Sequence, residues 1–190
     1  MIILASNSPR RRELLAGLDL EYRTWVISGI DESYPESLPT GEIAEFIACK
    51  KAEPYLMDGN IGEVADDDII LTADTVVILD DEVMGKPHDK EEAVSMLKKL
   101  SGKTHKVITG VCLASKTKQK SFSVQTNVTF AALTLQQIEY YVDRYKPYDK
   151  AGAYGVQEWI GYVGVTKLEG SYYNVMGLPV QRIYEEICDF

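Results

Sequence analysis

The sequence is poor in cysteine and in basic residues, and its hydrophobic runs are too short to cross a bilayer. Its three cysteines have no metal-binding spacing, and their odd number supports no disulfide framework. Reduced thiols are typical of the cytoplasm, so we expect a cytoplasmic protein. The first residues, Met1–Leu4, contain neither a basic stretch nor a cleavage pattern, which argues against a secretory signal.

Basic residues are outnumbered by acidic ones, 20 to 29, and the formal net charge is −9. A protein that binds nucleic acid backbones or anionic membranes needs a basic surface, so both are poor partners for this chain. Hydrophobic residues make up 45% of the 190 residues, which is enough for a packed core. This length favours one domain, although two lobes that share one sheet would also fit.

Several common catalytic motifs are absent: the Walker A loop, the dinucleotide fingerprint, the nucleophile elbow and the HExxH pair. Phosphate chemistry would therefore depend on arginine, lysine, carboxylate side chains and a metal ion. Consecutive acids at Asp66–Asp68 could suggest a metal site. They end a Gly- and Asp-rich stretch, residues 58–68, and such runs more often form a solvated loop.

An unusual helix start is present near the N-terminus. Ile2–Leu4 is a short apolar run, Ser8 is a preferred N-cap residue, Pro9 suits the first helical position, and Gly17 suits the far end. Arg10–Arg12 occupy the first turn, where each cation costs about 0.3–1 kcal/mol against the helix dipole. Either an anion such as phosphate binds there, or Ser8 is a plain cap and the arginines point into solvent.

A lone carboxylate interrupts a near-continuous apolar run at residues 69–79, which predicts a strand buried on both faces. Burial of Asp74 is costly unless it is paired, hydrogen-bonded or metal-bound. Desolvation strengthens a carboxylate as a base, which suits a general base. The alternative is an aspartate that ends the strand and caps a turn. Lys86, between Gly85 and Pro87, either directs an ammonium at a phosphate or lies in water.

The remaining patterns predict a mixed-sheet α/β fold, because strands and helices mix without strict alternation. Strands are predicted over residues 21–27, 69–79, 105–114, 122–130 and 160–168. Helices are predicted to begin near Pro9, Thr40, Asp89, Thr134 and Pro179. The second of these should be interrupted near Pro54 and bury Ile43, Phe46 and Ile47. Asp89 with Glu92 and Thr134 with Gln137 form capping boxes.

Two loops complete the candidate features. Residues 115–120 are polar and predict the link of a hairpin. Gly152 and Gly155 let the backbone approach a ligand closely, and Gln157 beyond them offers one hydrogen-bond donor and one acceptor. His105 is more typical of a strand residue than of a catalyst.

Together, the sequence motifs of this chain resemble those of the Maf family. They occur in the same order and at the same spacing as in that family. The motifs that carry the resemblance are Ser6-x-Ser8-Pro9-Arg10-Arg11, the turn at Glu32, Lys51-Ala52, Ala73-Asp74-Thr75-Val76-Val77, Gly85-Lys86-Pro87, Ser101-Gly102-x-x-His105-x-Val107-x-Thr109-Gly110-Val111, the stretch 149–157, and Gly170–Pro179. Residues 149–157, Asp-Lys-Ala-Gly-Ala-Tyr-Gly-Val-Gln, look like the branch that acts on dTTP and UTP.

The resemblance implies a single domain over residues 1–190, with an elongated central mixed sheet, flanking helices and a cleft between two lobes, as in inosine triphosphate pyrophosphatases. It implies a hydrolase of nucleotide metabolism that converts dTTP or UTP to the monophosphate and pyrophosphate with a divalent cation, Mg²⁺ or Mn²⁺. Modified pyrimidine nucleotides stay open as substrates of the same kind. The partner would be a small nucleotide, and a homodimer stays open as the oligomeric state.

The resemblance also assigns roles to individual residues. Asp74 falls on the general base, and the metal would be held by Glu32 and Asp74. The specificity positions fall on Arg10, Thr75 and Gln157. Phosphate contacts fall on Ser8, Arg11, Lys51 and Lys86. The chain departs from the family pattern at Pro54 and at Glu158-Trp159, which follow Gln157 where a glycine is common.

A nucleotide-binding regulator of cell division that performs no turnover is the competing hypothesis. Binding alone would require the cations more than a desolvated acid. The presence of Asp74 and Glu32 together with Lys51 and Lys86 therefore favours catalysis.

Overall fold

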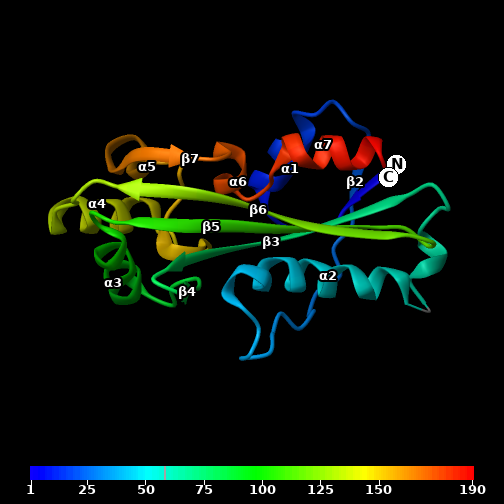
Figure 1. Cartoon of the computed structure of the whole chain (residues 1–190), viewed down its shortest axis with the longest axis horizontal. Helices are drawn as coiled ribbons and strands as arrows, with labels where there is room; N and C mark the ends of the chain where they lie inside the picture. The colour runs from blue at the N-terminus through cyan, green and yellow to red at the C-terminus, as the bar shows by residue number, and fades with distance from the viewer. Residues whose placement is uncertain (58) are drawn as a thin grey trace. The chain divides into compact units, whose positions relative to one another are not determined.

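A computed structural model describes residues 1–57 and 59–190, and in this part of the chain seven strands form one mixed sheet in the order β2-β1-β3-β5-β6-β7, with β4 paired to β3 (Figure 1). The strands are β1 (Ile2–Leu4), β2 (Tyr22–Thr24), β3 (Ile69–Leu79), β4 (Glu82–Met84), β5 (Thr104–Ala114), β6 (Gln119–Phe130) and β7 (Val165–Glu169). The predicted mixed α/β class is confirmed.

The α-helices are α1 (Pro9–Ala16), α2 (Ile43–Leu56), α3 (Lys90–Leu100), α4 (Leu135–Tyr145), α5 (Trp159–Gly164), α6 (Tyr172–Met176) and α7 (Val180–Cys188). Short 3-10 helices are η1 (Thr40–Glu42), η2 (Ile61–Glu63) and η3 (Ala151–Ala153). None of the helices that the structure describes is long and apolar enough to cross a membrane.

The chain divides into two compact units that share three long strands. The first unit contains residues 1–74, 109–124 and 177–190, and the second contains residues 75–108 and 125–176. β3, β5 and β6 therefore each contribute residues to both units. Asp74 is the last residue of the first segment, and Thr75 begins the second unit.

In the first unit, β1 pairs in parallel with β2 and with β3, so that Ile2 lies opposite Tyr22 on one side and Ile69 on the other. α2 covers one face of these strands and α7 the other face (Figure 1). α2 packs closely on β5, because a Cβ atom on Gly110 would lie 2.2 Å from the carbonyl carbon of Ala44. A glycine is therefore required at this contact.

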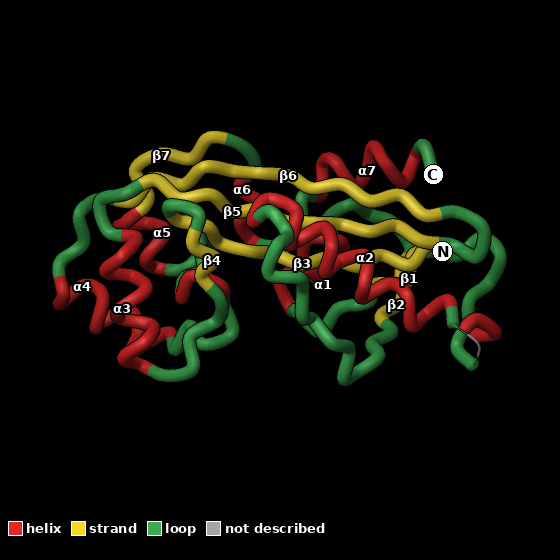
Figure 2. Tube along the Cα trace, turned by 60° about the horizontal axis from the view of Figure 1, so that its bottom comes forward, coloured by secondary structure: helices red, strands yellow, loops and turns green. Residues whose placement is uncertain are grey.

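In the second unit, α3 and α4 lie side by side (Figure 2). A core of aliphatic and aromatic side chains joins these helices to the strands, and it includes Val77, Leu97, Phe130, Tyr141 and Ile160. His105 belongs to this buried layer: its Nε2 lies 2.7 Å from the Tyr154 hydroxyl, and burial lowers its pKa to about 4. The prediction that His105 is a strand residue is confirmed.

The local signals for the starts of α1, α3 and α4 are confirmed, but the predicted capping box of α3 is incomplete, because Glu92 accepts the amide of His88 and not that of Asp89. Ser8 is the N-cap of α1 and its Oγ accepts the amide of Arg11 at 3.4 Å. Asp89 caps α3 through the amide of Glu92 at 2.8 Å. Thr134 opens α4 with a complete capping box. These starts were predictable because a cap depends on residues only a few positions apart.

The predicted strand over residues 160–168 is wrong in its first half. Residues Trp159–Gly164 form α5, and β7 begins only at Val165. A composition typical of strands does not decide the structure here, and Gly161 packs tightly on the loop before it, because a Cβ atom on it would lie 1.7 Å from the carbonyl oxygen of Val156. The glycine allows this helical turn to pack directly on the preceding loop.

α2 also differs from its prediction. Pro54 does not interrupt it, since the helix continues to Leu56 and the proline removes only one amide in the last turn. Thr40 is not a cap, because η1 begins there and precedes α2. Phe46 is exposed, and Tyr55 supplies the buried aromatic ring instead.

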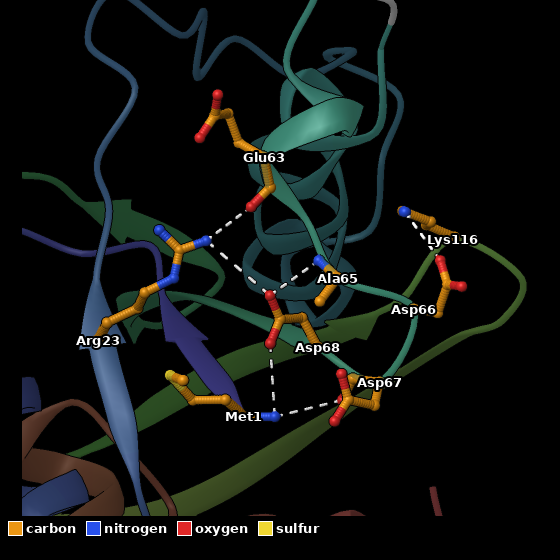
Figure 3. Close-up of polar contacts among 8 residues, drawn as sticks. All are labelled: Met1, Arg23, Glu63, Ala65, Asp66, Asp67, Asp68 and Lys116. Carbon is orange, nitrogen blue, oxygen red and sulfur yellow. Dashed lines mark hydrogen bonds and ion pairs between the residues drawn. The ribbon is translucent and has the colours of Figure 1, made fainter.

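The acidic run at residues 66–68 is only partly solvated. Asp66 and Asp67 are exposed, but Asp68 is buried, and the solvated-loop prediction is wrong for it. Its carboxylate lies 3.4 Å from the amino group of Met1 and 3.9 Å from Arg23, and it accepts the amide of Ala65 (Figure 3). These partners replace the lost water. Asp58, the first residue of the predicted loop, lies outside the described residues.

The contact between α2 and β5 gives a stability prediction. Replacing Gly110 by alanine should lower the free energy of unfolding by about 1–3 kcal/mol or more, because the helix backbone must move away. Gly41→Ala is the matched control, since a Cβ atom there meets nothing within 4 Å. Urea unfolding measures both, and equal stability of the two variants would contradict the close contact.

Candidate active site

A lysine between two carboxylates forms the centre of the candidate site. The Nζ atom of Lys51, on α2, lies 2.7 Å from Oδ1 of Asp74 and 3.1 Å from Oε1 of Glu32. The side chains of Lys51 and Asp74 are each 15% exposed, and that of Glu32 is 52% exposed. Asp74 lies in the middle of β3, so the alternative of a strand-ending cap is wrong.

α2 positions both carboxylates. The hydroxyl of Thr72 donates to the carbonyl of Ala48 at 2.6 Å, which joins β3 to α2 two residues before Asp74 and one turn before Lys51. Lys50 lies beside Lys51 and donates to Asp31 at 2.7 Å and to the carbonyl of Ser33 at 3.0 Å. These bonds attach the loop that contains Glu32 to the helix.

The loop that contains Glu32 is also held by the ion pair between Asp31 and Lys50. The hydrogen bond from Lys50, and then those from Ser33, hold the pKa of Asp31 below its usual value. Asp31 is therefore ionised over a wider pH range than a free aspartate. The Tyr55 hydroxyl, further along α2, donates to the carbonyl of Trp25 and accepts the amide of Ile27, both at 2.9 Å.

The arginines at the start of α1 have different environments. Arg11 donates through Nε to the carbonyl of Gly177 and through Nη1 to the carbonyl of Ala73, both at 2.8 Å. Burial lowers the pKa of its guanidinium, and the charge of Asp74 is the largest opposing effect. Arg12 is exposed, whereas Arg10 is half-buried. The interpretation that all three arginines point into solvent is therefore wrong for Arg11.

The other predicted site residues lie in the second unit. Thr75 follows Asp74 on β3, and Lys86 lies exposed in the loop after β4. The amide of Gly152 donates to the carbonyl of Gly85 at 3.0 Å, which joins the Lys86 loop to the stretch 149–157. Oε1 of Gln157 is buried and accepts no hydrogen bond from any described residue.

Sequence reasoning missed the residues that support this site. Thr72 was visible as a polar residue inside a buried apolar run, two positions before Asp74. Lys50 resembled an ordinary cation in a helix, and its role depends on Asp31, 19 positions away. Glu158 was visible only as a departure from a family pattern, although its carboxylate lies 3.1 Å from Lys150.

Glu32 and Asp74 supply two carboxylates that could hold a divalent cation. Both converge on the Lys51 ammonium, so the fold already gathers two hard oxygen donors around one positive charge. Mg²⁺ commonly binds one or two carboxylates and completes its shell with phosphate oxygens and water. No group of three or more His, Cys, Asp or Glu residues that could hold a metal occurs within the described ranges 1–57 and 59–190.

The two bonds of Arg11 give a second stability prediction. Arg11→Lys should lower the free energy of unfolding by about 1–3 kcal/mol, since one ammonium cannot reproduce a planar fork that bonds two carbonyls. Arg12→Lys on the same turn is the control and should change stability by less than about 0.5 kcal/mol. If thermal unfolding shows equal losses, Arg11 does not anchor this backbone.

The motifs predicted the relatives of this chain correctly. The family model described as Maf-like protein matches residues 1–190. A dTTP/UTP pyrophosphatase from Parabacteroides distasonis is 56% identical over 189 residues, which cover 100% of this chain and 95% of that protein. A dTTP/UTP pyrophosphatase from Phocaeicola vulgatus is 56% identical over 186 residues, 98% of this chain and 94% of that protein.

The fold was also compared with a solved structure of a nucleoside-triphosphatase / dITP/XTP pyrophosphatase from Mycobacterium abscessus. The superposition covers 97% of this chain and 92% of that chain, with a TM-score of 0.43 and 12% sequence identity. The whole-length family match and the two close relatives decide the classification. The chain belongs to the Maf family.

Proposed function

We propose that this chain hydrolyses dTTP and UTP to the nucleoside monophosphate and pyrophosphate. The observation that carries the proposal is the Lys51 ammonium held between the carboxylates of Asp74 and Glu32. Such an arrangement combines a base, a cation for phosphate oxygens and two oxygen donors for a metal. The relatives from P. distasonis and P. vulgatus are named dTTP/UTP pyrophosphatases, which supports the same reaction.

In the proposed reaction, Asp74 is the general base. Its Oδ1 atom lies 2.7 Å from the Nζ atom of Lys51, and its carboxylate would accept the proton of the attacking water. The oxygen of a water molecule bonds to the α-phosphorus while its proton passes to Asp74. The bond from the α-phosphorus to the bridging oxygen breaks, and pyrophosphate leaves with that oxygen.

The charge on the leaving pyrophosphate requires fixed cations. We propose Lys51 and Lys86 as phosphate contacts, together with Ser8 and Arg11 at the start of α1, where the helix amides also favour an anion. Arg11 has a second role here, because its bonds to the carbonyls of Gly177 and Ala73 hold the backbone next to Asp74.

Glu32 and Asp74 would hold Mg²⁺ or Mn²⁺ in this proposal. Bound there, the cation would neutralise phosphate charge and favour ionisation of the attacking water. Glu32 is suited to this task because its loop is attached to α2 through Asp31 and Lys50. Its side chain is half-exposed and therefore accessible to a nucleotide-bound cation.

Arg10, Thr75 and Gln157 are the proposed base-recognition residues. The amide of Gln157 can accept the N3–H of uracil or thymine and donate to a ring carbonyl. Cytosine has no proton at N3, so an amide held with Oε1 toward that atom would disfavour it. Modified pyrimidines that keep the N3–H would still be accepted. The substrate would be a free nucleotide of the cytoplasmic pool.

A panel of nucleoside triphosphates with Mg²⁺, read by pyrophosphate release, tests the proposal. We expect dTTP and UTP to give the highest kcat/KM. Asp74→Asn should lower kcat by about 10²–10⁴ because the proton acceptor is lost, while the nucleotide still binds. Asp80→Asn is the control: Asp80 lies in the exposed turn after the same strand, at φ +50°, which asparagine tolerates.

Two outcomes would overturn this function. Tight nucleotide binding without pyrophosphate release from any member of the panel would favour the regulator without turnover. Release of single phosphates would instead indicate a phosphatase.

A further inference from the structure

Glu158, directly after Gln157, takes part in a polar network within the second unit. Its Oε1 lies 3.1 Å from the Nζ atom of Lys150, and its Oε2 accepts the hydroxyl of Tyr141. The hydroxyl oxygen of Tyr141 in turn accepts the amide of Gly155 at 3.0 Å. Side chains from α4, from the stretch 149–157 and from the residue before α5 therefore meet around Gly155.

The network is largely shielded from water. Lys150 is 9% exposed, Glu158 is 19% exposed, and Tyr141 is fully buried. Burial, and then the hydrogen bond to Glu158, raise the pKa of Tyr141 above its usual value. Tyr141 therefore keeps its proton at neutral pH and remains a donor to the Glu158 carboxylate. Hydrogen bonds of this kind, between a hydroxyl and an ion, are among the stronger ones.

The ion pair also packs against the backbone of the loop. A Cβ atom on Gly155 would lie 3.0 Å from Cδ of Glu158 and 3.1 Å from Cε of Lys150. The amide of Glu158 donates to the carbonyl of Gly155 at 3.0 Å, which closes a turn around Val156 and Gln157. Both ends of this turn are thus attached to the network.

Gln157 lies within the turn that this network holds. Its Oε1 atom is buried and accepts no hydrogen bond from the residues that the structure describes. A buried acceptor without a protein donor can take a hydrogen bond from a water molecule or a ligand. The backbone that carries Gln157 is held at Gly155 and at Glu158, the two ends of the turn.

We propose that Glu158 is a positioning residue for pyrimidine selection: through Lys150 and Tyr141 it holds Gln157 so that Oε1 meets a base with an N3–H, favouring uracil and thymine over cytosine. This inference rests on the proposed function.

The test compares UTP with CTP in Glu158→Ala and Glu158→Gln. In Glu158→Ala, we expect KM for UTP to rise about tenfold with kcat within about twofold, since a displaced contact weakens binding. CTP hydrolysis should keep its kcat/KM, so the UTP-to-CTP ratio falls about tenfold. Glu158→Gln retains an acceptor for Tyr141 and should restore the ratio to within about threefold of the wild-type value.

Glu169→Ala is the matched control, because Glu169 lies at the end of β7 in the same unit and pairs with exposed Lys167 at 2.9 Å. The UTP-to-CTP ratio of kcat/KM in Glu169→Ala should equal that of the wild type. An equal loss for UTP and CTP in Glu158→Ala, or an unchanged ratio, would overturn the positioning role and leave the network as a support of the fold. Tyr141→Phe removes only the hydroxyl and should lower the ratio even if Glu158→Ala does not fold.

Calorimetric binding of a non-hydrolysable UTP analogue and its CTP counterpart separates this inference from the proposed function. If the wild type binds the UTP analogue selectively but turns over no nucleotide, only the proposed function fails. If the wild type hydrolyses UTP, and Glu158→Ala, Glu158→Gln and Tyr141→Phe all bind both analogues as it does, only the positioning role fails.

Discussion

The ion contact of Lys51 with Asp74 and Glu32 is the interaction on which the rest of the first unit depends. The side chains of Lys51 and Asp74 are each 15% exposed, so either charge would be costly there without the other, and the half-exposed Glu32 adds a second carboxylate to the ammonium. The surrounding structure serves to keep the three together. Thr72 joins the strand to the helix, and Lys50 attaches the Glu32 loop to the same helix.

β3 carries residues that we propose for the chemistry and for the recognition of a base. Asp74 closes the first segment of one unit, and Thr75 opens the other, so adjacent residues of one strand belong to the two proposed tasks. Arg11 fixes the backbone of this strand at Ala73. A rigid, hydrogen-bonded strand is a more exact support for a reactive group than a loop would be.

Features set by neighbouring residues could be predicted from the sequence. Ser8 and Thr134 cap helices through amides three residues later, and Asp74 is conspicuous as the one acid in an apolar strand. Features set by distant residues could not. Gly161 lies in a helical turn that packs on Val156, and Asp68 is buried because Met1 and Arg23 approach it. The contacts of Glu158 with Tyr141 and Lys150 likewise depend on the fold.

We propose that Lys51 and Asp74 act as one catalytic unit. A double-mutant cycle on kcat/KM for UTP, with Lys51→Met, Asp74→Asn and the double variant, tests it most directly. Residues that act as a unit have strongly non-additive effects, so the double variant should be no slower than the slower single variant. Losses that multiply would show that the two residues act independently and would contradict the claim.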